Sequence, residues 1–292
     1  MGENMEDKSI YLDYSANTPV DSSVLECYTK AVLEYYGNPN STHHAGTLAN
    51  ERLSKTTNSI ADIIKVKPNE LIYTSGASES NNLAIKGIAR ISRHRGKHII
   101  STSLEHSSVS GTLTYLQENG YEIDLVHITS DGIIDLEHLK SLIRDDTILV
   151  CVTAVDSELG VVQPIDEISK IVANFPNCKL HVDATQCIGK AEFSFAGVDT
   201  ASFTAHKFYG LNGCGMLYKR EDTIIEPLIH GGKSVTVYRS GTPDVAMAIA
   251  MEKALKLAID SLNVRTEHVI HINEYLTEHL KKYPLVKINS TN

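Results

Sequence analysis

The strongest constraint on the fold is a regular alternation of short apolar runs with helical segments between residues 70 and 219. Seven runs rich in β-branched and apolar residues have the length of strands, at 70–75, 97–103, 122–128, 147–155, 179–184, 200–205 and 213–219. Helical patterns lie between the earlier ones, at 79–92, 109–119, 135–143 and 165–175. Apolar strands joined through helices pair in parallel and are covered on both faces. The sequence therefore predicts an α/β fold with a mainly parallel seven-stranded sheet flanked by helices.

The pattern changes after residue 243. Two long segments of helical periodicity, 244–262 and 264–283, are followed by one strand-like run at 285–289. A strand needs a neighbour for its backbone hydrogen bonds, and this one has no other strand near it in the sequence. We therefore expect an α/β domain with a helical exit and an unfinished C-terminal end.

Composition and charge argue against several classes of function. The chain carries 27 basic and 36 acidic residues, a net charge of −9, without a block of like charges, which disfavours nucleic acid or an anionic membrane as partner. Its longest apolar run, 148–155, is too short to span a bilayer, and its polar N-terminus is no signal peptide. The five cysteines are scattered without a CxxC pair, so we expect reduced thiols, no metal site and a cytoplasmic protein.

Polar residues follow several strands, at the positions where open α/β sheets bind ligands. After 70–75 comes "GASESNN", whose small and hydroxyl residues open a helix and offer an anion site, unless Ser78 is only its N-cap. His106, after 97–103, is either a ligand contact or a structural histidine. Asp183 ends an apolar strand, so its carboxylate needs a cationic partner unless it caps a local turn.

The stretch "SFTAHKFYG", at 202–210, places a lysine among aromatic and small residues. Lys207 either extends its charge to solvent over a buried stem or works as an amine nucleophile whose pKa its surroundings lower. Arg239, in "RSGTP" before a helix, offers a further anion contact.

Pyridoxal 5′-phosphate (PLP) is a cofactor that uses all of these groups. Its phosphate suits the hydroxyl-rich helix start, and its flat ring stacks on a histidine. Its protonated pyridine nitrogen pairs with a carboxylate, and its aldehyde forms a Schiff base with a lysine. The combination therefore favours a PLP enzyme and the nucleophilic interpretation of Lys207.

A series of motifs resembles, in order and at similar spacing, the signatures of the cysteine desulfurases. The motifs are "YLDYSANTPVD", "GNPNSTHHAG", "YTSGASESNNLAIKG", "EHSSV", "ELGVVQPI", "HVDATQCIG", "SFTAHKFYG" and "RSGTP". The resemblance extends from about residue 11 to about residue 260. Cysteine desulfurases belong to the class V aminotransferases among the fold-type I PLP-dependent enzymes, so the resemblance implies that fold.

The resemblance implies that ten residues contact the cofactor: Ala77, Ser78, His106, Asp156, Asp183, Gln186, Thr204, His206, Lys207 and Thr242. Lys207 would form the Schiff base, and His106 would stack on the ring and help to move protons. Asp183 would bind the pyridine nitrogen, while Gln186 and Asp156 would contact the phenolic oxygen. The other five would bind phosphate, with Thr242 reaching that of the neighbouring subunit in a homodimer with shared active sites.

The resemblance also implies a large PLP-binding domain at 12–260 and a small α+β domain from 1–11 and 261–292, whose C-terminal portion is missing. The implied activity removes sulfur from L-cysteine, giving L-alanine and an enzyme persulfide. The persulfide would pass sulfur to an acceptor or scaffold protein for iron–sulfur clusters or thiolated products. Two alternatives stay open: a selenocysteine lyase or other class V lyase or aminotransferase, and a non-catalytic PLP-binding subunit.

The chain departs from the family pattern in two respects. Asp156 stands where the family usually has asparagine, either as a harmless variation or as a functional retuning. The persulfide-forming cysteine and a substrate-binding arginine lie, in the family, beyond the last residue of this chain. None of the five cysteines takes that loop position; Cys151 and Cys187 are expected in the core, and Cys214 lies in a glycine-rich segment.

Overall fold

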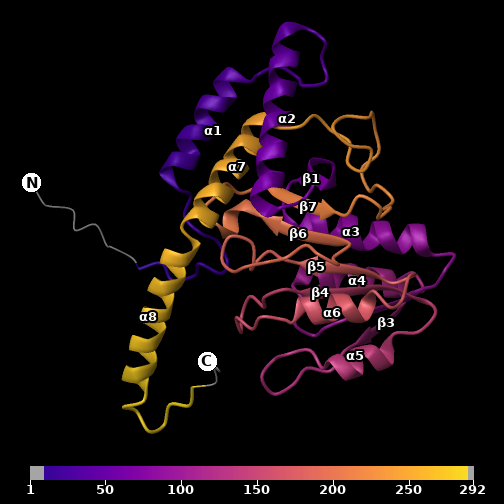
Figure 1. The fold of residues 1–292 in the computed structure, drawn as a ribbon, viewed down its shortest axis with the longest axis vertical. Coiled ribbons are helices and arrows are strands. Elements are labelled where there is room, and N and C mark those ends of the chain that lie inside the picture. Colours follow the sequence, from indigo (N-terminus) through magenta and orange to yellow (C-terminus); the bar gives the residue numbers. More distant parts are fainter. Residues whose placement is uncertain (1–9, 289–292) are drawn as a thin grey trace, which may run out of the picture.

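The computed structural model describes residues 10–288, in which a seven-stranded sheet carries helices on both faces (Figure 1). The strands are β1 (Leu71–Thr74), β2 (His98–Ser101), β3 (Glu122–Leu125), β4 (Thr147–Thr153), β5 (Lys179–Asp183), β6 (Thr200–Thr204) and β7 (Gly215–Lys219). Their order across the sheet is β1-β7-β6-β5-β4-β2-β3. β7 runs antiparallel to both of its neighbours, and the other pairs are parallel. The predicted mainly parallel seven-stranded sheet is confirmed.

Six helices correspond to the predicted segments: α3 (Ala77–Ser92), α4 (Ser107–Glu118), α5 (Leu136–Leu142), α6 (Ile165–Val172), α7 (Val245–Asp260) and α8 (Leu262–Leu280). Two short 3-10 turns, η1 (Pro68–Glu70) and η2 (Ala205–Lys207), precede β1 and follow β6.

Two further helices, α1 (Ser22–Glu34) and α2 (His44–Ile64), have no counterpart among the predicted segments. Their sequence signals were present. Asp21 caps α1 by accepting a hydrogen bond from the N–H of Ser23 at 2.8 Å. The buried residues of α2 recur at helical spacing, as Leu53, Ile60 and Ile64 do.

The two faces of the sheet bury separate layers of side chains. β4 is buried along its whole length, and successive residues point to opposite faces. Val150 and Val152 join the core beneath α2, α5, α6 and α7, whereas Leu149 and Cys151 join the core beneath α3 and α4. Helices therefore cover both faces, and the loops after the parallel strands gather at the edge formed by their carboxyl ends.

The last two helices differ in how they pack. α7 lies against α1 and α2, whereas α8 extends away from the sheet and buries none of its side chains (Figure 1). The strand expected at 285–289 is absent over its described part, 285–288, where Leu285 is fully exposed and no neighbouring strand is available for pairing; residue 289 lies outside the described residues. The division into a large and a small domain stays a prediction. No helix within residues 10–288 is long and apolar enough to cross a bilayer.

Candidate functional site

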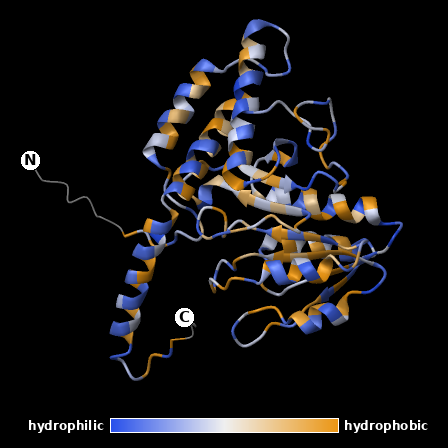
Figure 2. Ribbon diagram, in the orientation of Figure 1, coloured by the Kyte–Doolittle hydropathy of each residue, from blue (hydrophilic) through white to orange (hydrophobic). Residues whose placement is uncertain are grey.

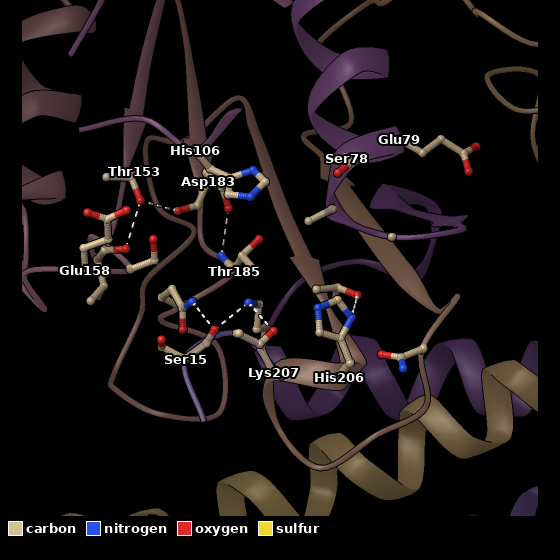
Figure 3. A pocket seen from close by; sticks show the side chains of 18 of the residues that line it. Ser15, Ser78, Glu79, His106, Thr153, Glu158, Asp183, Thr185, His206 and Lys207 are labelled. Atoms are coloured by element: carbon tan, nitrogen blue, oxygen red, sulfur yellow. Dashed lines mark hydrogen bonds between the residues drawn. The ribbon is translucent and has the colours of Figure 1, made fainter. Parts of the chain in front are cut away.

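A cavity of about 650 Å³ opens at the carboxyl ends of β4, β5 and β6, beside the N-terminus of α3 (Figure 3). Its walls include eight of the ten residues expected to contact a cofactor: Ala77, Ser78, His106, Asp183, Gln186, Thr204, His206 and Lys207. Segments far apart in the sequence thus meet at the edge of the sheet where α/β proteins bind ligands. The volume is typical of a small-molecule site.

The N-terminus of α3 forms one wall. Gly76, rather than Ser78, is the N-cap, so the interpretation of Ser78 as a capping residue is wrong. Ser78 is exposed in the first turn of α3, where backbone N–H groups have no partners within the helix, and it lines the cavity. A side chain at Gly215 of β7 would come within 2.4 Å of Gly76, so this close approach requires glycine. The helix start is therefore held against the sheet with its donors facing the cavity.

Lys207 enters the cavity from η2, directly after β6. Phe203 and Phe208 are fully buried on either side and anchor the backbone, while the lysine side chain is half-buried. Its Nζ donates hydrogen bonds to the carbonyl oxygens of Ser15 (2.5 Å) and Ala16 (2.8 Å). Burial lowers the pKa of Lys207, although the charge of Asp183 opposes the shift. A lowered pKa increases the share of neutral amine, which is the nucleophilic form.

His206 and Thr204 lie beside Lys207. The ring nitrogen Nδ1 of His206 is 3.1 Å from the hydroxyl of Thr204. Burial, followed by the charge of Lys207, lowers the pKa of His206. Tyr209, two residues after the lysine, has φ of 65°, an uncommon backbone conformation for a residue other than glycine. The Thr18 hydroxyl accepts the Tyr209 N–H at 2.7 Å and stabilises this turn.

Asp183 is buried at the end of β5, with 4% of its surface exposed. One carboxylate oxygen accepts the N–H of Thr185 at 3.0 Å, and the other accepts the side-chain amide of Asn81 at 2.8 Å. The local turn contact considered from the sequence is therefore present, but Asp183 also lines the cavity. A carboxylate has about four acceptor positions, so capacity remains for a ligand.

His106 is the N-cap of α4, and its exposed ring lines the cavity. Its Nδ1 accepts the N–H of Ser108 at 3.1 Å. In the view of Figure 3, His106 and Asp183 lie toward one side of Lys207, and Ser78 and His206 toward the other. The carboxylate and the start of α3 thus lie on different sides of the amine in this view.

Two of the expected cofactor contacts do not line this cavity. Asp156 is buried, and its Oδ1 accepts the backbone N–H groups of Glu158 (3.0 Å) and Leu159, so its carboxylate caps the local turn. Its expected contact with a phenolic oxygen stays a prediction. Thr242 also lies outside the lining, and its contact with a neighbouring subunit's phosphate stays a prediction.

Arg239 does not offer the free cation expected from the sequence. Its Nε pairs at 2.9 Å with Glu79, whose other oxygen accepts the N–H of Ser75 at 2.7 Å. The guanidinium therefore ties its loop to the first turn of α3.

Several wall residues were not selected from the sequence, among them Ser15, Ala16, Glu158, Thr185 and Asn212. Ser15 and Ala16 contribute backbone carbonyls, and Gln186 donates its side-chain N–H to Ser15 at 2.8 Å. Carbonyl contacts leave no signal in residue type. Only the place of Ser15 and Ala16 inside the motif "YLDYSANTPVD" could have indicated them.

All five cysteines fall within residues 10–288, and none of them lines the cavity. Cys151, Cys178, Cys187 and Cys214 are buried, and burial raises the pKa of each thiol, to about 12 for the last three. Cys27 is partly exposed on α1. The expectation that Cys151 and Cys187 are core thiols agrees with their packing.

Comparison with known proteins gives a consistent family. The aminotransferase class-V model matches residues 10–292. The chain is 39% identical over 277 residues to "Cysteine desulfurase IscS" of Dictyoglomus turgidum, covering 94% of this chain and 70% of the relative. It is 36% identical to "Cysteine desulfurase IscS" of Methanosarcina thermophila, covering 99% of this chain and 72% of the relative.

Solved structures agree with this grouping. A structure titled "NIFS-LIKE PROTEIN" superposes with a TM-score of 0.93 at 37% identity, covering 97% of this chain and 78% of the other. One titled "SspA in complex with cysteine" has a TM-score of 0.80 at 33% identity, covering 85% of this chain and 72% of the other.

Proposed function

The chain belongs to the class V aminotransferases, a PLP-dependent family with the fold-type I architecture, and from this premise we propose that it binds PLP and acts on L-cysteine as a cysteine desulfurase. The observation that carries the proposal is the convergence of Lys207, Asp183, His106 and the start of α3 on one cavity. The relative solved in complex with cysteine supports this amino acid as a ligand of the cavity.

The residues present fit the chemical parts of PLP. The first turn of α3, with Ser78, and the pair Thr204 and His206 offer donors for a phosphate. Asp183 offers a carboxylate already oriented by two N–H donors, which suits a protonated pyridine nitrogen. Lys207 offers an amine whose lowered pKa suits attachment to an aldehyde.

Each of these side chains has a distinct task in the proposed reaction. When bound, PLP supplies an electron sink for a substrate carbon. Asp183 would hold a proton on the pyridine nitrogen, and His106 would cover the ring and carry a proton at its edge. Lys207 would first hold the aldehyde and then, as a neutral amine, accept the proton from the substrate Cα.

Sulfur transfer needs one more group, a thiolate that attacks the substrate sulfur. Because the five cysteines of this chain lie away from the cavity, we expect polypeptide other than these 292 residues to supply that thiol. The proposal includes a cytoplasmic homodimer that passes sulfur to an acceptor or scaffold protein for iron–sulfur clusters or thiolation.

Cofactor labelling and isotope exchange test the proposal. The purified chain with PLP should be yellow, and borohydride reduction should attach the cofactor to the peptide that carries Lys207. Lys219 is the matched control, because its buried Nζ donates to three backbone carbonyls, of Arg220, Glu221 and Thr223. A label on Lys219 or Lys190 would contradict the assignment.

The reaction itself is followed in deuterated water. We expect the PLP-loaded chain to exchange the Cα proton of L-cysteine while releasing almost no sulfide or alanine. Rapid sulfide release would identify one of the five cysteines as the nucleophile, with Cys214 the first to substitute. Cofactor binding without exchange would favour a non-catalytic subunit.

A further inference from the structure

Asn81, on α3, is fully buried behind the cavity and joins two of the residues that line it. Its Nδ2 donates to Asp183 Oδ2 and to Ser108 Oγ, both at 2.8 Å, and its Oδ1 lies 3.0 Å from His181 Nε2. Both amide protons and the amide oxygen are therefore in use. The proposed function assigns no role to this residue.

The direction of each hydrogen bond around Asn81 follows from Asp183. An ionised carboxylate only accepts, so the Nδ2 of Asn81 must face it, and Oδ1 must face His181. His181 Nε2 must then carry a proton, while its Nδ1 accepts from the Thr200 hydroxyl at 2.9 Å. Burial lowers the pKa of His181 to about 4, which keeps the ring neutral as this arrangement requires.

A second branch runs from Asn81 to His106 through Ser108. Because Ser108 Oγ accepts from Asn81, its own proton is free to donate to His106 Nδ1, 2.8 Å away. The backbone N–H of Ser108 donates to the same nitrogen at 3.1 Å. A nitrogen that accepts two hydrogen bonds carries no proton, so the neutral His106 ring has its proton on Nε2. Within residues 10–288, Nε2 makes no hydrogen bond.

We propose that Asn81 is a positioning residue that orients the Asp183 carboxylate and holds the Ser108 hydroxyl as a second donor to His106 Nδ1, which reinforces the Nε2–H tautomer set by the Ser108 N–H. One buried amide would thereby couple the group that faces the pyridine nitrogen to the group that covers the ring. In this tautomer His106 presents a proton rather than a lone pair at its free nitrogen, so it would act as an acid while Lys207 acts as the base. This division of roles rests on the proposed function, but the tautomer itself does not.

The tautomer can be measured without cofactor. In ¹⁵N-histidine-labelled protein, long-range proton–nitrogen NMR distinguishes the two neutral forms, and His106→Gln identifies the His106 signals. We expect the parent to show the Nε2–H pattern. Asn81→Leu, which can neither donate nor accept, should keep the Nε2–H pattern, because the Ser108 N–H still donates to Nδ1, but it should shift the Nδ1 resonance of His106 because the Ser108 hydroxyl is no longer held as a donor. Asn82→Leu is the matched control, because Asn82 bonds only to the Ser78 carbonyl of its own helix.

Cofactor affinity provides the second readout. Loss of a hydrogen bond to a charged group should weaken PLP binding by Asn81→Leu by roughly tenfold or more, whereas Asn82→Leu should bind as the parent does. If Asn81→Leu does not fold, Asn81→Asp decides. That variant regains a donor to Asp183 only when its new carboxyl is protonated. Its affinity for PLP, compared with that of Asn82→Asp, should therefore improve as the pH falls.

The outcomes separate the two proposals. An unchanged His106 Nδ1 resonance and an unchanged PLP affinity in the Asn81 variants, with only a lower melting temperature, would reduce Asn81 to a structural residue and overturn this inference. A parent that binds no PLP, together with a His106 Nδ1 resonance that is displaced in Asn81→Leu but not in Asn82→Leu, would leave this inference standing and overturn the proposed function.

Discussion

The wall of the cavity and the helix α8 differ in how completely their side chains are partnered. In the wall and directly behind it, Asp183, Asn81 and His181 are buried, and each has at least two hydrogen-bond partners. In α8, no side chain is buried, and apolar residues such as Ile272 and Leu276 are half exposed. Hydrophobic and hydrophilic residues are mixed along this helix (Figure 2). A substitution in the wall leaves another buried group unpaired, whereas one in α8 removes few contacts. Sensitivity to substitution should therefore differ sharply between the two regions.

The largest expected difference concerns carboxylates. Asp183→Ala removes the group expected to keep the pyridine nitrogen protonated, so α-proton exchange at equal PLP occupancy should fall by several orders of magnitude. Glu274→Ala, at an exposed position of α8, should exchange at the parent rate. Exchange by Asp183→Ala at the parent rate would show that this carboxylate has only a structural role.

The buried network also explains how far the sequence could lead. Apolar runs and strand ends are local features of the sequence. The strands and most helices could therefore be predicted, and eight of the ten expected cofactor residues lie at the cavity. The contact between Asn81 and Asp183 joins positions 102 residues apart, and no local pattern contains it. The turn contact of Asp156 is local, but its residue type does not show whether the carboxylate caps the turn or faces the cavity. The expected strand at 285–289 failed in its described part for the converse reason, since a strand pattern forms a strand only where a neighbour is available.

The second prediction compares α7 with α8 directly. Leu255, on α7, is fully buried in the main core, so Leu255→Ala should lower the free energy of unfolding by about 2–5 kcal/mol. Leu276, on α8, is 52% exposed, and Leu276→Ala should change the free energy of unfolding by less than about 0.5 kcal/mol. Urea unfolding of both variants measures the difference. A cost above about 2 kcal/mol for Leu276→Ala would mean that α8 is covered in solution, and the comparison would fail.

The smallest expected effect is the change in the free energy of unfolding per pH unit that is due to Glu105, the residue before His106. Its Oε1 accepts from the Thr102 hydroxyl and the Thr153 N–H, both at 2.8 Å, while its Oε2 is buried and has no partner within residues 10–288. Burial raises the pKa of Glu105 from 4.5 to about 8, and the charges of Asp183 and Asp156 add to the shift. Near neutral pH the folded chain therefore holds this carboxyl protonated, whereas the unfolded chain does not.

The sign of the pH dependence follows from that proton. Between about pH 4.5 and about pH 8 the folded state binds one more proton than the unfolded state, so this group's contribution to stability falls as the pH rises. The slope is roughly 1.4 kcal/mol per pH unit for one proton, and it levels off above the folded pKa. Glu105→Gln keeps the shape of the protonated acid but cannot titrate, so its stability relative to the parent should rise across this range. The measurement is urea unfolding from pH 5 to pH 9, with Glu278→Gln on α8 as the matched control. If the free energies of unfolding of the parent and of Glu105→Gln changed in parallel with pH, Glu105 would be ionised in the folded chain.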